Sequence, residues 1–304
     1  MQYTEINNEV KLSRLVLGCM RIANLDTAAV LELIETALEH GVNFFDHADI
    51  YGGGRSEEVF AQALAQKKGL REKIFIQTKC GIRPGFYDFS KEHILESVDG
   101  SLRRLRTDYI DVLLLHRPDT LMEPDEVAEA FTALEKAGKV RFFGVSNHNP
   151  MQIELLQQAL PQKIMFNQLQ FGPAHTGMID AGINVNMLTD GAVVRDGGVL
   201  EYCRLKGITI QAWSPLQFGF FEGVFLEHPD FQELNDVLQR IGDEQRVSKA
   251  AVAAAWILRH PAQMQIVVGT TNPGRLSDLC RATGVELSRQ QWYEIYQAAG
   301  NELP

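Results

Sequence analysis

The feature that most constrains the fold of this chain is a regular alternation of short apolar runs with segments of helical periodicity. Each run is nearly all apolar, which is typical of parallel strands covered by helices on both sides. The eight runs span residues 14–18, 43–47, 73–79, 109–115, 140–145, 164–168, 208–213 and 265–269. Eight strand-and-helix units within about 250 residues match a closed (β/α)8 TIM barrel. We therefore predict an α/β protein whose single domain covers residues 1–304.

An open, doubly wound sheet is the alternative arrangement of the same elements. Such sheets carry a G-x-G-x-x-G turn after the first strand or a G-x-x-x-x-G-K-[ST] phosphate loop. No G-x-G-x-x-G follows the first strand here, and the second motif does not occur in the sequence. Capping residues support the helices of the barrel, since Asp26 or Thr27 begins the first and Asn149 precedes Pro150 at another.

Charge and cysteine usage narrow the class of function. The formal net charge of -10 argues against nucleic acid or an anionic membrane as a partner. The four cysteines lie far apart without a C-x-x-C pair, so neither a zinc site nor a redox dithiol is indicated. No uncharged apolar run approaches the roughly 20 residues that span a bilayer, and no signal peptide is recognisable. We expect a cytoplasmic protein; the oligomeric state has no signature in the sequence.

Ionisable residues gather where three of the predicted strands end. Asp46 closes the second strand and Tyr51 follows it, Lys79 ends the third strand, and His116 follows the fourth. The carboxyl ends of barrel strands share one rim, where active sites of this fold lie. We therefore predict that the four side chains converge there.

These four residue types suit proton transfer to a carbonyl oxygen. A cation beside a phenol favours the phenolate, so we expect Lys79 to lower the pKa of Tyr51. Asp46 would hold the ammonium group, and His116 would hydrogen-bond a substrate oxygen. Each residue alone has a plainer interpretation as a solvated rim charge or a structural histidine.

A metal site is an alternative that His47 and Asp49 suggest. Only one imidazole is close by and the H-x-H pair of barrel metal hydrolases is missing, so we predict no metal.

Two long insertions interrupt the alternation, one after the sixth strand and one after the seventh. Residues 171–198 show no helical or strand period, and residues 216–229 are rich in phenylalanine, at positions 218, 220, 221 and 225. The loops that follow barrel strands form the catalytic face, so we expect both insertions to wall the substrate pocket. Packing against the barrel or contact with another subunit is the alternative.

The order of these motifs resembles the aldo-keto reductase superfamily over nearly the whole chain. The matching stretches are Asp46-x-Ala48-x-x-Tyr51-Gly52, Thr78-Lys79, Leu-Leu-His116, Gly144-Val-Ser146-Asn147 and Asn167-Gln168. Asp46, Tyr51, Lys79 and His116 match the catalytic tetrad of that superfamily. The stretch from His47 to Gly53 and the run Trp213-Ser-Pro-Leu216-Gln are most similar to its bacterial YdhF-like oxidoreductase branch.

This resemblance implies NADPH-dependent reduction of an aldehyde or ketone to an alcohol, with NAD(H) as the alternative cofactor. It implies that Ser146, Asn147 and Gln168 hold the nicotinamide carboxamide and that Trp213 stacks on the nicotinamide ring. It places Ser214 and Leu216 at the pyrophosphate or ribose. The stretch that resembles the adenosine phosphate loop contains Gly269, Thr270, Thr271, Asn272 and Arg275.

The residues themselves also indicate an anion site after the eighth strand. Asn272 caps and Pro273 opens a helix, whose free N–H groups and dipole attract an anion. Arg275 adds a guanidinium that can bind a phosphate with two hydrogen bonds. The expected partner is thus a small carbonyl substrate beside a nicotinamide cofactor. The alternative on the same scaffold is a cofactor-sensing binding subunit with little turnover.

Overall fold

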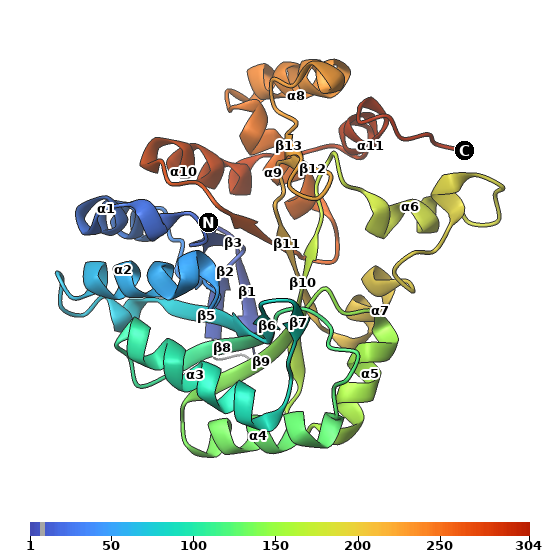
Figure 1. Ribbon diagram of the computed structural model, residues 1–304. Coiled ribbons are helices and arrows are strands. Elements are labelled where there is room, and N and C mark those ends of the chain that lie inside the picture. Colours follow the sequence, from blue (N-terminus) through green and yellow to red (C-terminus); the bar gives the residue numbers. More distant parts are fainter. Residues whose placement is uncertain (7–9) are drawn as a thin grey trace.

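The computed structural model describes residues 1–6 and 10–304, and its centre is a closed barrel of eight strands (Figure 1). Neighbouring strands around the barrel are all parallel. The predicted (β/α)8 barrel is therefore confirmed and the open sheet is excluded. The strands are β3 (Leu15–Gly18), β4 (Phe44–Asp46), β5 (Phe75–Cys80), β8 (Ile110–Leu115), β9 (Val140–Ser146), β10 (Ile164–Gln170), β11 (Thr209–Trp213) and β14 (Gln265–Val268).

Helices surround the barrel and bury their apolar faces against its strands. Asp26 caps the first helix by accepting a hydrogen bond from the Ala29 N–H, and Asn149 forms a capping box with Gln152. The helices are α1 (Thr27–Glu39), α2 (Arg55–Leu64), α3 (Lys91–Leu105), α4 (Pro124–Lys136), α5 (Pro150–Ala159), α6 (Gly177–Ile183), α7 (Val199–Lys206), α8 (Gln232–Gln245), α9 (Lys249–Arg259), α10 (Pro273–Cys280) and α11 (Arg289–Ala298).

A hairpin closes the amino-terminal end of the barrel. Its strands β1 (Tyr3–Ile6) and β2 (Val10–Ser13) pair antiparallel, and the residues between them lie outside the described part of the chain. Its buried side chains Ile6 and Leu12 pack in one cluster with Phe44, Val112 and Phe166 of the barrel interior. Within the described part of the chain, these side chains fill the amino-terminal end of the barrel.

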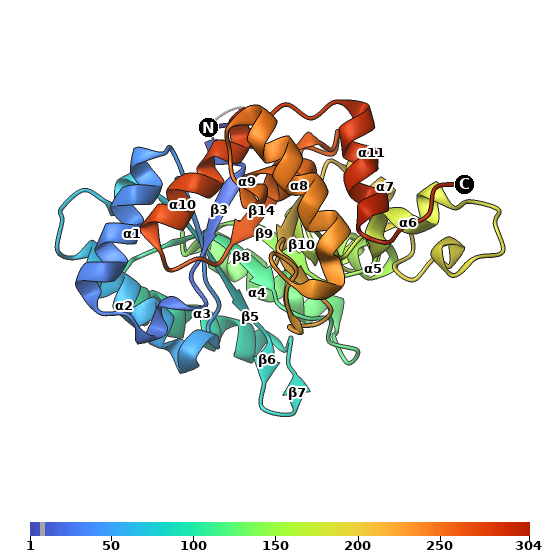
Figure 2. The ribbon, with the colours of Figure 1, turned by 90° about the horizontal axis from the view of Figure 1, so that it is seen from above.

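Two further hairpins lie at the opposite, carboxyl-terminal end of the barrel. One pairs β6 (Ile82–Arg83) with β7 (Phe86–Tyr87), and the other pairs β12 (Gln217–Phe218) with β13 (Gly223–Val224). Figure 2 shows β6 and β7 on the opposite side of the barrel from the N-terminus.

The insertion after β10 differs from its expectation, because residues 177–183 form α6 and residues 190–192 form a 3-10 turn. Side chains anchor it to the carboxyl-terminal segment. Tyr296 donates a hydrogen bond to Asp180 at 2.9 Å, and the Thr176 and Asn301 side chains are 3.2 Å apart. Figures 1 and 2 both place α6 beside the C-terminus, at the edge of the molecule.

The described residues contain no helix that is both long enough and apolar enough to cross a bilayer. All four cysteines are buried and none forms a disulfide.

Candidate active site

The tips of β4 and β5 bring a carboxylate, an ammonium group and a phenol into direct contact. The Lys79 Nζ donates hydrogen bonds to Asp46 Oδ2 at 2.8 Å, to the Tyr51 hydroxyl at 3.0 Å and to the His47 carbonyl at 2.8 Å. Lys79 is fully buried and Asp46 is 2% exposed. All three ammonium protons thus have acceptors, which is what a buried charge requires.

Backbone geometry holds Tyr51 in this position. Tyr51 begins a 3-10 turn whose glycines have positive φ, with values of 59° at Gly52 and 91° at Gly54. A Cβ atom at Gly52 would lie 2.5 Å from the Cβ of Ala23. Side chains are excluded there by both conformation and space, so the glycine run has a role beyond a simple turn.

Burial and charge compete in setting the proton affinities of this cluster. Burial alone would lower the pKa of Lys79, but Asp46 and Tyr51 together outweigh it, so that the lysine stays charged. Burial raises the pKa of Tyr51 and the ammonium of Lys79 lowers it, with burial the larger effect. Lys79 thus lowers the Tyr51 pKa as expected, but burial outweighs it and the pKa lies above its usual value. Tyr51 is a protonated phenol at neutral pH.

His116 completes the cluster from the end of β8. Its ring meets the Tyr51 ring edge to face, with centroids 6.1 Å apart. Burial, followed by the charges of Lys79 and Arg117, lowers the His116 pKa well below its usual value. The imidazole is therefore neutral, and its Nδ1 has no hydrogen-bond partner among the residues that the structure describes.

Glutamine side chains inside the barrel support the Asp46 carboxylate. Its Oδ1 accepts hydrogen bonds from Gln77 Nε2 at 2.5 Å and from Gln168 Nε2 at 3.0 Å. Both amides also donate to Gln211 Oε1, which lies deeper in the barrel. The carboxylate is thus held by two amides on one oxygen and by an ammonium on the other.

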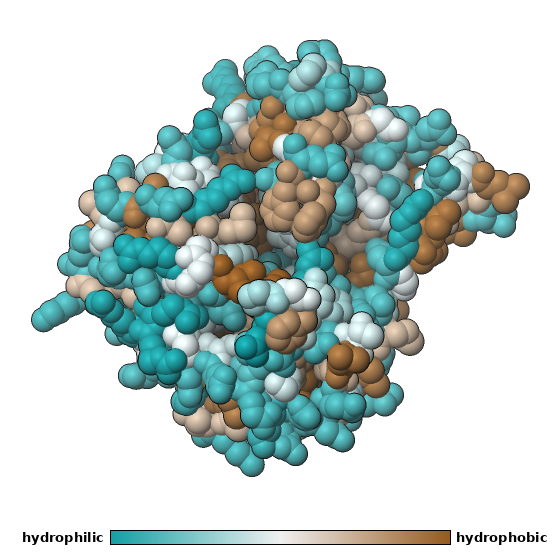
Figure 3. All heavy atoms as spheres, viewed as in Figure 1, coloured by the Kyte–Doolittle hydropathy of each residue, from teal (hydrophilic) through white to brown (hydrophobic). Residues whose placement is uncertain are grey.

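A cavity of about 1070 Å³ opens above these residues at the carboxyl-terminal end of the barrel. Figure 3 shows this face of the molecule hollowed between the two hairpins, with hydrophobic side chains around the hollow. Ten of the eleven residues expected to bind a cofactor line the cavity, together with Asp46, Tyr51 and His116. The ten are Ser146, Asn147, Gln168, Trp213, Ser214, Leu216, Gly269, Thr270, Thr271 and Arg275.

The eleventh residue, Asn272, does not line the cavity but caps α10 below it. Its side chain accepts a hydrogen bond from the Arg275 N–H at 2.9 Å. The side chain of Arg275 has no acidic partner within 4 Å in the described chain. An anion at this helix terminus would therefore meet an uncompensated guanidinium.

The wall of the cavity near His116 is aromatic. Trp213 donates a hydrogen bond from its indole to Asn147 Oδ1 at 3.1 Å, which fixes the ring plane. Phe221 is stacked on Trp213 and Phe220 meets it edge on, with centroids 5.9 and 6.3 Å away. The Arg117 guanidinium lies 5.6 Å from the Phe220 ring centre.

The two insertions contribute unequally to this wall. Phe220 and Phe221, from the insertion after β11, line the cavity as expected. Phe218 and Phe225 pack instead against Phe231, away from the cavity. No residue of 171–198 lines it, so the expectation for that insertion was wrong, and its side chains Thr176 and Asp180 instead contact the carboxyl-terminal segment.

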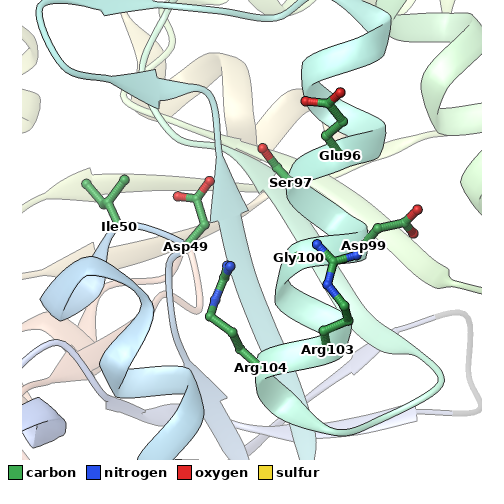
Figure 4. A pocket seen from close by; sticks show the side chains of 8 residues that line it. All are labelled: Asp49, Ile50, Glu96, Ser97, Asp99, Gly100, Arg103 and Arg104. Atoms are coloured by element: carbon green, nitrogen blue, oxygen red, sulfur yellow. The ribbon is translucent and has the colours of Figure 1, made fainter.

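A second, smaller cavity of about 570 Å³ lies on the other side of the loop that carries Tyr51. It lies between residues 49–50 and α3, and Figure 4 shows Arg104 reaching from α3 toward the loop. Arg104 donates to the buried carboxylate of Glu57 at 2.7 Å. Asp49 Oδ1 has no hydrogen-bond partner among the described residues. Burial and the charge of Glu57 raise the Asp49 pKa to about 7.

The sequence analysis missed the glutamines beneath the cluster. Gln77 lies within β5, Gln211 lies within β11 and Gln265 begins β14, and all three are fully buried. An amide side chain within or at the start of a strand that is predicted to be buried on both faces is the pattern that could have revealed them.

Comparison with known proteins matches residues 14–299 to the model of the aldo/keto reductase family. The uncharacterised oxidoreductase YcsN of Bacillus subtilis is 40% identical over 319 aligned positions, covering all of both chains. A 6-dehydroglucose reductase of Agrobacterium fabrum is 38% identical, again over all of both chains. The oxidoreductase YdhF of Escherichia coli is 37% identical over 97% of this chain and 96% of its own.

Proposed function

This chain belongs to the aldo/keto reductase family of oxidoreductases, and from that premise we propose that it reduces an aldehyde or ketone to an alcohol with NADPH. The observation that carries the proposal is the three-way contact of Lys79 with Asp46 and Tyr51 at the floor of the large cavity. A buried ammonium bonded to a protonated phenol is an arrangement suited to proton donation.

The cavity fits a nicotinamide cofactor by the chemistry of its lining. Gln168 presents an amide oxygen that accepts no hydrogen bond within the described chain, which suits a carboxamide N–H. Arg275, which has no acidic partner among the described residues, and the start of α10 suit the phosphate groups. A 2′-phosphate would give NADPH the advantage over NADH. When bound there, the reduced nicotinamide supplies the hydride that the carbonyl carbon accepts.

Tyr51 is the proton donor in this proposal. Its hydroxyl is protonated at neutral pH and lies on the cavity floor, where a carbonyl oxygen can approach it. As the oxygen takes the proton, negative charge develops on Tyr51, and the adjacent Lys79 ammonium stabilises it. Asp46 keeps Lys79 charged and in place. The cation therefore acts on the transition state rather than on the resting phenol.

His116 orients the carbonyl in this proposal. A neutral imidazole can donate one hydrogen bond to the carbonyl oxygen without competing as an acid, and the pKa of His116 is far too low for protonation at neutral pH. Tyr51 and His116 would then contact the same oxygen from two sides, which aligns the carbonyl carbon for attack.

The aromatic wall and the Arg117 guanidinium favour a small carbonyl compound with an apolar face and a polar group. The Agrobacterium relative is named for reduction of 6-dehydroglucose, an aldehyde. We therefore place 6-dehydroglucose beside benzaldehyde and an aliphatic aldehyde in the first substrate panel.

The test is Tyr51→Phe, which removes the hydroxyl and keeps the ring. We expect turnover to fall at least about 100-fold, as for loss of a general acid, while NADPH still quenches the protein fluorescence. Tyr87→Phe is the matched control, because Tyr87 lines the same cavity but is 45% exposed and belongs to a hairpin. Retention of most activity in Tyr51→Phe would refute the assignment. Absence of NADPH binding by the unmodified protein would refute the cofactor.

A further inference from the structure

Five polar side chains form one connected chain of hydrogen bonds through the barrel interior. Strand register aligns the five in two groups, since Gln168 pairs with Gln211 and Gln211 with Gln265, while Asp46 pairs with Gln77. Gln77 bridges the two groups by donating across the barrel to Gln211 Oε1 at 2.9 Å. The chain runs from the Asp46 carboxylate at one end of the barrel to the Ser13 carbonyl near the other.

The direction of every amide in this chain follows from its two ends. A backbone carbonyl only accepts, so Gln265 must turn its Nε2 to the Ser13 oxygen, at 3.1 Å, and its Oε1 to Gln211. Gln211 then donates to Gln265 and offers its own Oε1 to Gln77 and Gln168, at 2.9 and 3.0 Å. At the other end, an ionised Asp46 also only accepts.

The consequence falls on Gln168, the member of the chain that lines the cavity. Both protons of its Nε2 are committed, one to Asp46 and one to Gln211. A flip of this amide would set its oxygen against two acceptors. Its Oε1 is therefore locked toward the cavity, where it can accept but not donate a hydrogen bond.

We propose that Gln77, Gln211 and Gln265 are positioning residues that lock the Gln168 carbonyl toward the amide N–H2 of the nicotinamide carboxamide. The inference rests on the proposed use of a nicotinamide cofactor. It explains why a barrel interior that ordinarily holds branched apolar side chains keeps three fully buried glutamines here. An apolar interior would fill the same space without imposing a direction on Gln168.

The test compares two cofactors that differ at the group in question. In the 3-acetylpyridine analogue of NADP, a methyl group replaces the NH2 of the carboxamide. The Gln168 carbonyl therefore has no hydrogen bond to accept from this analogue. We expect the unmodified protein to bind the analogue about tenfold more weakly than NADP, the value of one buried hydrogen bond. Gln211→Met keeps the side-chain length but removes the amide oxygen that holds Gln168. In this variant the ratio of the two dissociation constants, analogue to NADP, should fall to about threefold or less. Fluorescence titration measures both binding constants without turnover.

Two further variants separate positioning from stability. Val112→Ala opens a hole in the same interior without touching the hydrogen-bond chain, so it should destabilise the fold and leave the ratio unchanged. Gln265→Met removes the link between Gln211 and the Ser13 carbonyl, one step further from the cofactor. It should lower the ratio of dissociation constants by a smaller factor. It carries the test if Gln211→Met does not fold.

The outcomes distinguish this inference from the function on which it rests. If the unmodified protein binds neither nucleotide, the proposed function and this inference fail together. If it binds both and Gln211→Met or Gln265→Met keeps the tenfold ratio, the cofactor assignment stands and the positioning role is refuted.

Discussion

Two carboxylates only three residues apart, Asp46 and Asp49, lie on opposite sides of one loop in contrasting surroundings. Asp46 faces the large cavity and accepts hydrogen bonds from two amides and the Lys79 ammonium. Asp49 faces the small cavity beside α3, where one of its oxygens has no partner within the described chain. Its backbone N–H donates to the Lys79 carbonyl, so both carboxylates belong to the same structural unit.

The difference shows that one loop can bury one carboxylate among matching partners and leave its neighbour without them. The Asp49 pKa of about 7 reflects burial and the negative charge of Glu57, which Arg104 offsets only in part. On the other side of the loop, the Asp46 carboxylate is matched by the Lys79 ammonium and by the amide donors of Gln77 and Gln168. The loop thus separates a carboxylate whose charge is balanced by its partners from one whose charge is balanced only in part.

Removal of Lys79 is expected to have the largest effect. Lys79→Met leaves the Asp46 charge buried without its cation, which should cost about 3–5 kcal/mol of unfolding free energy. Turnover should fall at least about 100-fold, because no cation stabilises the developing phenolate. Urea unfolding and steady-state kinetics measure the two effects.

The double variant Lys79→Met/Asp46→Asn tests the reason for that loss. It removes both charges, so it should recover most of the stability but none of the activity. If the double variant is as unstable as Lys79→Met, the loss comes from packing and not from the unpaired carboxylate.

A smaller effect is expected from breaking the ion pair behind the loop. Arg104→Met leaves the wholly buried Glu57 with the Thr78 hydroxyl as its one side-chain partner among the described residues, which should cost about 2 kcal/mol. Turnover should change far less than in Lys79→Met. Arg103→Met is the matched control, because Arg103 is an exposed neighbour on α3 that forms no ion pair in the described chain. Equal losses of stability in the two variants would contradict the role given to Arg104.

The smallest expected effect is a change in how the free energy of unfolding depends on pH, caused by the ionisation of Asp49. An acid whose pKa is higher in the folded than in the unfolded state loses stability as pH rises between the two values, here from about 4 to about 7. Asp49→Asn removes this loss, so its stability relative to the unmodified protein should increase from pH 5 to pH 8. The increase cannot exceed about 1.4 kcal/mol per pH unit.

Denaturant unfolding at the two pH values measures that change, with Asp108→Asn as the exposed control. The same pH dependence in Asp49→Asn and in the unmodified protein would show that Asp49 titrates normally in the fold.

Strand periodicity was enough to predict the barrel and the convergence of Asp46, Tyr51, Lys79 and His116. Parallel strands end on one rim whatever their order in space, so residues at several strand ends are brought near one another by topology alone. The insertion at 171–198 could not be placed in this way. Its contacts with Tyr296 and Asn301 join segments more than a hundred residues apart, and no local pattern encodes them.

The fold and the meeting of four ionisable side chains at one rim are thus encoded in the sequence, because periodicity and strand ends are properties of short segments. The proton affinities of Tyr51 and Asp49 and the orientation of Gln168 belong to the folded molecule alone. They depend on burial and on contacts across the barrel, such as that between Gln77 and Gln211, which are 134 residues apart in sequence. Desolvation and long-range hydrogen bonds exist only once the chain has closed around them.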